Sequence, residues 1–331
     1  MEFIYEYGLF LAKTVTFVLA FAVIVLLIVG AAASKARPSK AQLIFSDLTE
    51  QYHQRVEQMQ QKLLNKKQFK SWSKQQANAE KLLTKRLYVV DFNGSMDAKE
   101  VDALREEVTA ILSVATPEDE VLLRLESGGG VVHGYGLAAS QLDRLRQQNI
   151  PLTVAVDKVA ASGGYMMACI GHKLIAAPFA IIGSIGVIAQ LPNFHKLLQK
   201  HDVDFEQFTA GEFKRTVTLF AKNTESGREK FQQELEQTHQ LFKRFVQDHR
   251  PELEIDKVAT GEHWFGYQAL ELNLVDMLQT SDDYMLSHLS TRHIYQVKFQ
   301  LKKGIAEKIG VGSAGILSIW WQKIAQISRL S

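Results

Sequence analysis

Features that place a chain in a specialised class are scarce in this 331-residue sequence. It has a single cysteine, Cys169, so it forms no intrachain disulfide and its redox compartment stays open. Proline occurs only 6 times, and the net charge of +2 gives no general indication of nucleic-acid binding. The 46% of hydrophobic and 22% of charged residues are instead typical of a globular chain that buries a core.

Formal charge is absent from residues 14–33, where Val, Leu, Ile, Phe and Ala dominate. A helix over these twenty residues spans about 30 Å, the thickness of a bilayer's hydrocarbon layer. The preceding residues carry Glu2 and Glu6 instead of the basic start of a signal peptide. We therefore expect an uncleaved transmembrane helix over residues 9–33 after a short tail (1–8), with cleavage after the small residues at its end as the alternative.

The residues after this span are basic. Residues 34–86 hold 12 Lys/Arg against 4 Asp/Glu, which beside a membrane suits anionic lipid headgroups better than a nucleic-acid site. Only Lys13 precedes the span, so the positive-inside rule favours a cytoplasmic position for the rest of the chain. Leu48, Tyr52 and Val56 recur at helical spacing, and we expect residues 34–86 to form a basic helical spacer.

A second uncharged run covers residues 174–191. Pro178, Gly183 and Gly186 interrupt it, so it is a poor membrane helix. Continuous apolar runs are also typical of strands that are buried on both faces. We expect this segment to belong to a buried core.

Strand and helix patterns alternate from residue 87 onward. This order predicts a largely parallel sheet covered by helices, in a domain over residues 87–290. The expected strands cover 87–92, 121–125, 152–156 and 173–176, and the expected helices cover 97–113, 131–148, 162–170 and 223–247.

Two glycine-rich turns follow strands of this predicted sheet. One contains Gly128, Gly129 and Gly130, and the other contains Ser162 with the glycines after it. Loops at the carboxyl ends of parallel strands are where such folds place their chemistry, and glycine lets the backbone approach a substrate. Ser162 fits either a nucleophile beside free N–H groups or an ordinary helix N-cap, and this loop alone does not decide between them.

A nucleophilic serine needs a base. His133 lies near the glycine turn, but no aspartate is placed to complete a triad with it. An ordinary lysine, with a pKa of about 10.4, is neutral roughly 0.04% of the time at pH 7, so a base lysine needs burial or a cationic neighbour. Lys158, Lys173 and Lys214 are candidates, and their spacing does not choose among them.

Several ordered motifs resemble the signal peptide peptidase A family of Ser/Lys-dyad peptidases. The residues before the domain and the start of its first turn resemble in particular the SohB branch of that family. The matching segments are residues 123–130, 159–165, 182–187, 209–214, 259–266 and 273–276, with 91–97 for the branch.

The resemblance implies a role for individual residues. Ser162 is the nucleophile, Lys214 is the general base and Ser184 orients the lysine, while the N–H groups of Gly129 and Gly163 form the oxyanion hole. It also implies an α/β fold, the Clp-protease/crotonase-like spiral. The family usually has proline where this chain has Gly128, so the loop should be looser here.

The resemblance further implies a homo-oligomeric ring in which serine and lysine meet between subunits. Acting at a bacterial inner membrane, this ring would cleave hydrophobic peptides or membrane-associated polypeptides through an acyl-enzyme. No cofactor, metal or nucleic acid is expected, and the side of the membrane stays open. A C-terminal extension (291–331) carries a helical pattern over 316–330 that suits a membrane surface or a neighbouring chain, with plain packing onto the domain as the alternative. An acyl-CoA enzyme of the crotonase kind and a non-catalytic membrane scaffold are the alternatives.

Overall fold

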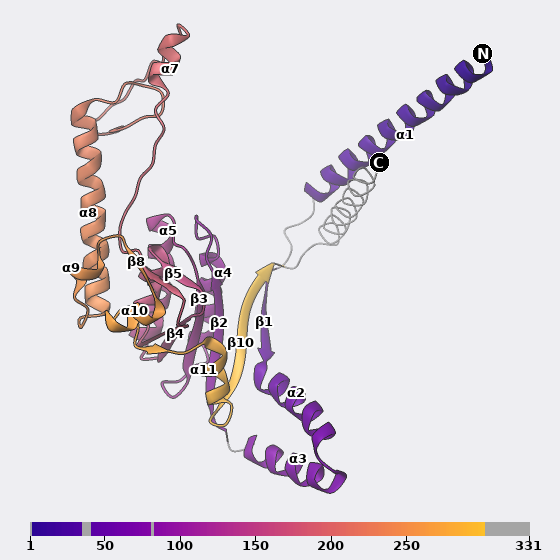
Figure 1. The fold of residues 1–331 in the computed structure, drawn as a ribbon, viewed down its shortest axis with the longest axis vertical. Helices are drawn as coiled ribbons and strands as arrows, with labels where there is room; N and C mark the ends of the chain where they lie inside the picture. The colour runs from indigo at the N-terminus through magenta and orange to yellow at the C-terminus, as the bar shows by residue number, and fades with distance from the viewer. Residues whose placement is uncertain (1, 35–40, 81–82, 302–331) are drawn as a thin grey trace. The chain divides into compact units, whose positions relative to one another are not determined.

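The computed structural model describes residues 2–34, 41–80 and 83–301, and it divides into two units. The first unit contains helix α1 (Glu2–Ser34) (Figure 1). Its segment Tyr5–Ala22 is apolar enough, by length and composition, to cross a membrane. Residues 9–33, predicted as a transmembrane helix, are all helical, and α1 also includes residues 2–8 of the predicted tail. The pattern over 316–330 lies outside the described residues.

The second unit, Leu43–Phe299, is built on a seven-stranded sheet of order β1-β10-β2-β3-β4-β6-β9. The pairs from β10 to β9 are all parallel, as the alternating pattern predicts. The strands are β1 (Ala41–Asp47), β2 (Lys85–Asn93), β3 (Glu120–Glu126), β4 (Leu152–Val156), β6 (Lys173–Ala176), β9 (Met277–Leu278) and β10 (Arg292–Leu301).

Both faces of this sheet are buried, which explains the continuous apolar runs. Val90, Leu123 and Val154 point into the larger core with helices α4 (Val101–Leu112) and α5 (Val132–Gln147). Their neighbours Val89 and Leu122 point to the opposite face, where they pack with α11 (Ser281–His288). Side chains alternate between faces along a strand, so a strand covered on both sides is apolar throughout.

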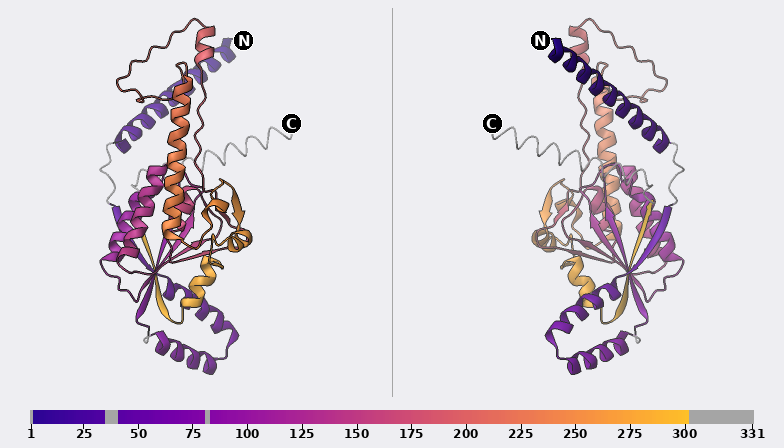
Figure 2. Two further views of the ribbon diagram at one scale, coloured as in Figure 1. Left: turned by 90° about the vertical axis from the view of Figure 1, so that its left-hand side faces the viewer. Right: turned by 90° about the vertical axis from the view of Figure 1, so that its right-hand side faces the viewer.

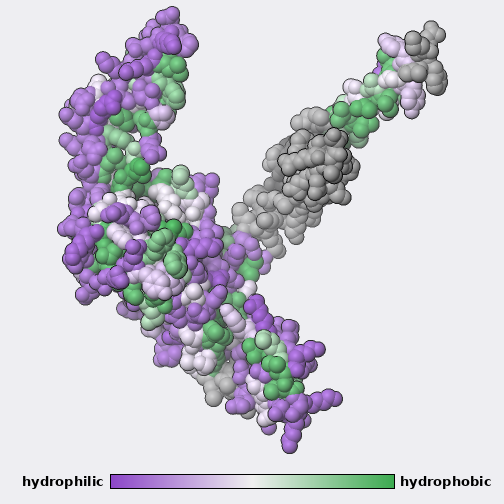
Figure 3. Space-filling model, in the orientation of Figure 1, coloured by the Kyte–Doolittle hydropathy of each residue, from purple (hydrophilic) through white to green (hydrophobic). Residues whose placement is uncertain are grey.

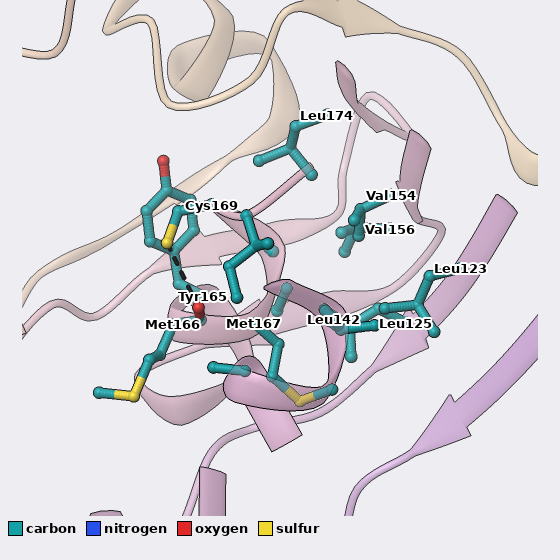
Figure 4. Packing of buried hydrophobic residues seen from close by; sticks show 14 of the residues in the cluster. Leu123, Leu125, Leu142, Val154, Val156, Tyr165, Met166, Met167, Cys169 and Leu174 are labelled. Carbon is teal, nitrogen blue, oxygen red and sulfur yellow. Dashed lines mark hydrogen bonds between the residues drawn. The ribbon is translucent and has the colours of Figure 1, made fainter. Parts of the chain in front are cut away.

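A second, three-stranded sheet lies beside the first. It consists of β5 (Val159–Ala161), β7 (Ile181–Gly183) and β8 (His263–Phe265), with β5 and β7 parallel. The short helix α6 (Gly163–Ala168) follows β5, and its side chains enter the larger core (Figure 4). The uncharged run 174–191 thus begins with buried β6 and continues into β7, as expected of a core segment.

The long helix α8 (Glu225–His249) packs its C-terminal half, through Phe242 and Val246, onto the larger core. The segment 187–224 is here called the arm. The arm and the N-terminal half of α8 extend away from the sheets (Figure 2). The arm carries α7 (His195–Lys200) and exposes large apolar side chains among hydrophilic ones (Figure 3).

The predicted spacer is only partly helical. It contains α2 (Leu48–Leu63) and α3 (Lys66–Glu80), but residues 41–47 form β1 next to β10. The remaining short helices are α9 (Ile255–Val258) and α10 (Gly266–Glu271).

Candidate active site

Ser162 occupies a sharp turn between β5 and α6. Its φ of 53° and ψ of −118° lie where a residue with a side chain is strained, at a cost of about 1–3 kcal/mol. The Ser162 N–H donates to the Gly183 carbonyl at 2.8 Å, and its side chain makes no helix-capping hydrogen bond. The ordinary N-cap interpretation of this serine is therefore not supported, and the strained turn resembles the geometry that presents a nucleophile.

The glycine turn after β3 lies directly against this serine. A Cβ on Gly129 would lie 2.7 Å from the Gly163 nitrogen and 2.8 Å from the Ser162 Cβ, and the φ of Gly129 is +85°. Both the conformation and the contact require glycine at this position. The backbone of the turn consequently forms one wall around the Ser162 side chain.

A cleft of about 570 Å³ opens at this point. Ser162 and Ser184 both line it, so the structure brings these two predicted residues together. The other lining residues are Met96, Gly128, Gly129, Gly130, Gly186, Val187, Ile188, His239, Thr260 and Gly261.

Ser184 directly follows β7, as Ser162 directly follows β5. Ala161 and Gly183 are register partners in this parallel pair, so each serine is the first residue beyond it. Ser184 also has a positive φ, of 51°, and its N–H donates to the Glu262 carbonyl at 2.6 Å. Adjacent strands lie about 4.8 Å apart, which places the two serines side by side.

The expected oxyanion donors differ in their surroundings. The Gly163 N–H, at the start of α6, has no acceptor among the described residues. The Gly129 N–H instead donates to Ser127 Oγ at 3.0 Å. Gly130 also borders the Ser162 cleft, and its N–H has no acceptor in the described part of the chain. The family resemblance named Gly129 as the donor from this turn, and nothing in the sequence indicated the free N–H of Gly130.

A second, much smaller cavity of about 20 Å³ also borders Ser162. It lies between α6 and α8, and Met166 and Phe242 form part of its wall. The other lining residues are Gly130, Val132, Gly163, Gly186, Val187 and Thr238. No sequence pattern indicated this cavity, because helical Met and Phe residues are equally typical of a core.

His239 is another residue of the cleft that the sequence did not indicate. It lies on α8, is half-buried, and one of its ring nitrogens lies 3.2 Å from the Ile185 carbonyl. This contact joins α8 to the residue after Ser184. The predicted alternative base, His133, is exposed on α5 and lines neither cavity that borders Ser162.

None of the candidate lysines lines either cavity at Ser162. Lys158 pairs with Glu126 at 2.9 Å, beside a different cleft. Lys173 lies at the start of β6, with its Nζ 5.2 Å from the centre of the Tyr284 ring.

Lys214 is exposed on the arm, next to Phe213. The Phe213 ring lies under Lys230 of α8 at 5.2 Å. Lys230 precedes His239 of the cleft by nine residues, or about 14 Å along the helix. The structure of one chain thus keeps this part of the arm apart from Ser162.

The chain's cysteine is not a competing nucleophile. Cys169 is wholly buried at the end of α6, where its Sγ lies 3.3 Å from the Met166 carbonyl (Figure 4). Burial raises the pKa of this thiol to about 12, so the reactive thiolate is disfavoured.

Comparison with known proteins gives matches along most of the chain. Residues 2–142 match Peptidase family S49 N-terminal, and residues 144–292 match Peptidase family S49. A probable protease SohB of Haemophilus influenzae is 51% identical over 325 residues, which cover 92% of this chain and 91% of that protein. A probable protease SohB of Buchnera aphidicola is 49% identical over 305 residues, covering 87% of this chain and 100% of that protein.

Proposed function

The chain belongs to peptidase family S49, the signal peptide peptidase A family of serine peptidases, and from this premise we propose that it is a membrane-anchored endopeptidase with Ser162 as its nucleophile. The observation that carries this proposal is the strained turn at Ser162. The turn directs the residue into a cleft walled by the backbone of a glycine turn, which suits attack on a peptide carbonyl.

In the proposed reaction, Ser162 Oγ attacks the carbonyl carbon while its proton passes to a neutral lysine. The carbonyl oxygen becomes an oxyanion and accepts hydrogen bonds from backbone N–H groups. Collapse of this adduct expels the amine, which takes the proton from the lysine, and leaves an ester on Ser162. Water then attacks the ester by the same proton path, releasing the acid and restoring Ser162.

Gly163 and the glycine turn supply the oxyanion donors in this proposal. The Gly163 N–H has no competing acceptor among described residues. The Gly129 N–H can donate to the oxyanion only if its hydrogen bond to Ser127 Oγ breaks. The N–H of Gly130 is therefore the better second donor. Gly129 then shapes the turn through its positive φ and its contact with Gly163.

Lys214 is the proposed base, and a neighbouring chain supplies it. In one chain Lys214 is exposed and lies on the arm, away from the Ser162 cleft. A base lysine needs an enclosed, apolar position, which the arm gains only when it packs against another subunit. The arm offers the apolar surface for such packing, because Ile188, Leu197 and Phe208 are 77%, 52% and 89% exposed. Ser184, beside Ser162, would orient the arriving lysine.

The remaining features fit a single-pass subunit at a bacterial inner membrane, and we propose that such subunits assemble into a ring. The N-terminal helix meets the length and composition of a membrane span, and the basic residues after it suit anionic lipid. The parallel sheet, with a small second sheet that carries Ser162, is consistent with the Clp-protease/crotonase-like spiral. The proposed substrates are hydrophobic peptides or membrane-associated polypeptides.

Labelling with a fluorophosphonate probe tests the nucleophile. The full-length protein in detergent should react, and Ser162→Ala should not, while exposed Ser140→Ala reacts like the native protein. Lys214→Ala should abolish peptide hydrolysis. If Lys214→Ala retains hydrolysis of an acyl-CoA thioester, the acyl-CoA alternative gains support instead.

Mixing inactive variants tests the shared site. Ser162→Ala and Lys214→Ala chains, unfolded together and reassembled, should recover part of the native activity. The largest recovery from a random mixture is expected near equal amounts of the two chains. No recovery, with both chains present in one oligomer, would place serine and lysine in the same subunit.

A further inference from the structure

Tyr135 is wholly buried in the first turns of α5, behind the wall of the cleft at Ser162. Its ring meets Phe92 edge-on at 6.4 Å. It lines neither cavity that borders Ser162, so it has no direct contact with a substrate there. From sequence alone it is indistinguishable from an ordinary core tyrosine.

A chain of hydrogen bonds links its hydroxyl to the glycine turn. The Gly129 N–H donates to Ser127 Oγ at 3.0 Å, Ser127 Oγ lies 2.5 Å from Tyr135 Oη, and Tyr135 Oη donates to the Ser95 carbonyl at 2.8 Å. An N–H only donates and a carbonyl only accepts, so both ends of the chain are fixed. Tyr135 uses its one hydroxyl proton to donate to the Ser95 carbonyl, so the Ser127 hydroxyl must donate to Tyr135.

The two hydroxyl groups at the centre of this hydrogen-bond chain are removed from water, which strengthens the bond between them. Ser127 is 2% exposed and Tyr135 is fully covered. Burial raises the pKa of the Tyr135 hydroxyl above its ordinary value, so it remains a donor throughout the neutral range. A buried hydroxyl that loses its partner is costly, and the chain consequently holds Ser127 and the turn in one arrangement.

The ring of the same tyrosine meets the other side of the site. A Cβ on Gly163 would lie 2.5 Å from Tyr135 Cγ, so the backbone beside Ser162 rests directly on the ring. Tyr135 thus contacts Gly163 through its ring and controls the Gly129 turn through its hydroxyl. These are the two backbone segments that face the carbonyl oxygen in the proposed reaction.

We propose that Tyr135 is a positioning residue, which fixes the separation of the two oxyanion-binding segments through its ring and its hydroxyl. This inference rests on the proposed peptidase function. Removing the hydroxyl should loosen the glycine turn relative to Gly163, so the transition state loses stabilisation while the ground-state substrate is bound as before.

The test is Tyr135→Phe in the full-length protein, which keeps the ring and removes only the hydroxyl. We expect kcat to fall about 10-fold or more with KM changed less than about 2-fold. The affinity for a peptide boronate, which forms a tetrahedral adduct with a serine, should fall by a similar factor. Ser127→Ala breaks the same chain from the other end and should act alike, and the double variant should lose no more than either single one.

Tyr284→Phe is the matched control. Its hydroxyl is also buried and bonded, to Glu120 at 2.5 Å and Thr153 at 3.1 Å, but it lies on the opposite face of the sheet. It should lower thermal stability without lowering kcat. If Tyr135→Phe and Ser127→Ala lose stability like this control yet keep native kcat and boronate affinity, Tyr135 is only structural.

The role of Ser162 as nucleophile and the positioning role of Tyr135 can be overturned by different results. Native turnover in Ser162→Ala would overturn Ser162 as the nucleophile and this inference with it. An inactive Ser162→Ala together with an unimpaired Tyr135→Phe and Ser127→Ala would overturn only the positioning role. If Tyr135→Phe does not fold, Ser127→Ala alone decides by the same kcat and boronate measurements.

Discussion

Ser162 and Ser184 are equivalent positions on two paired strands. Each is the first residue beyond the β5–β7 pair, where Ala161 faces Gly183, and each has a φ just above +50°. The Ser162 N–H donates to the Gly183 carbonyl at 2.8 Å, which joins the two turns. Two strained serines, 22 residues apart in sequence, are thereby presented to one cleft.

Ser184→Ala should lower kcat by about 10²-fold or more, because the base lysine loses the hydroxyl that orients it. Thermal stability should stay near native, since alanine and serine are strained alike at this φ. Ser184→Gly is the matched control, because it also removes the hydroxyl but relieves the strain. It should be at least as stable as native and as inactive as Ser184→Ala. Native kcat in both variants would remove Ser184 from the mechanism.

Neighbouring glycines of the turn should respond in opposite ways. Gly129→Ala forces a Cβ within 2.7 Å of two backbone atoms at a φ of +85°, so we expect at least about 10²-fold less activity and a stability loss of about 1–3 kcal/mol. Gly128 has a negative φ and no atom within 4 Å of a Cβ. Gly128→Pro should therefore keep or raise kcat by stiffening the turn.

Peptide hydrolysis and thermal melting of the two variants check this prediction. A large loss of kcat in Gly128→Pro would mean that the turn must move during the reaction. Native activity in Gly129→Ala would mean that the contact with Gly163 is not needed.

The sheet could be predicted because its strands are buried on both faces. The runs at 121–125, 152–156 and 173–176 are mostly apolar, with Arg124, Thr153 and Lys173 as the exceptions, and they match β3, β4 and β6 within a residue. β1 was missed because Ala41–Asp47 is mixed in polarity and mostly exposed, so its pairing comes from its place next to β10. The local pattern of apolar residues indicates which strands are buried. It does not indicate which segment pairs with the edge of the sheet.

The site was only partly predictable. The family resemblance implied that Ser162 is the nucleophile, but the position of Ser162 beside Ser184 depends on the register of β5 and β7, which no local pattern encodes. The role inferred for Tyr135 depends on hydrogen bonds across 40 residues to Ser95, so helical spacing alone could not reveal it. In the proposed oligomer, the position of Lys214 relative to Ser162 depends on how the arm packs against a neighbouring chain, which local sequence pattern does not report.

Glu107 should make stability depend on pH. This residue of α4 is 4% exposed and accepts the Phe299 N–H at 2.7 Å, and burial raises its carboxyl pKa from 4.5 to about 7. Between these values the folded state holds the proton more tightly than the unfolded state. The contribution of Glu107 to the free energy of unfolding is therefore complete below about pH 4.5. This contribution, about 3 kcal/mol in total, is lost as pH rises through about 7.

Glu107→Gln should remove this dependence, because the amide oxygen still accepts from Phe299 and does not titrate. Melting temperatures at pH 5 and pH 8 measure the effect: the native protein should lose more stability than Glu107→Gln over this interval. Glu106→Gln, an exposed neighbour on the same helix, should behave like the native protein. An equal pH response in Glu107→Gln would show that another group is responsible.

The small cavity beside Ser162 should select the substrate residue whose carbonyl is attacked. Its volume of about 20 Å³ holds roughly one water-sized group, and Met166 and Phe242 form apolar parts of its wall. A methyl group fits and a larger side chain does not, so alanine is expected at this position of the substrate. Met166→Ala should enlarge the cavity and shift the preference towards leucine.

The shift is measured by the ratio of kcat/KM for two peptides that carry leucine or alanine at the residue whose carbonyl is attacked. This ratio should change by about 10-fold or more. Met167→Ala is the matched control, because Met167 is fully buried, lines neither cavity at Ser162 and leaves α6 in a different direction (Figure 4). Both variants should lose about 2–5 kcal/mol of stability, because each removes a buried side chain. Only Met166→Ala should change the ratio, and an unchanged ratio would mean that the substrate side chain binds in the larger cleft instead.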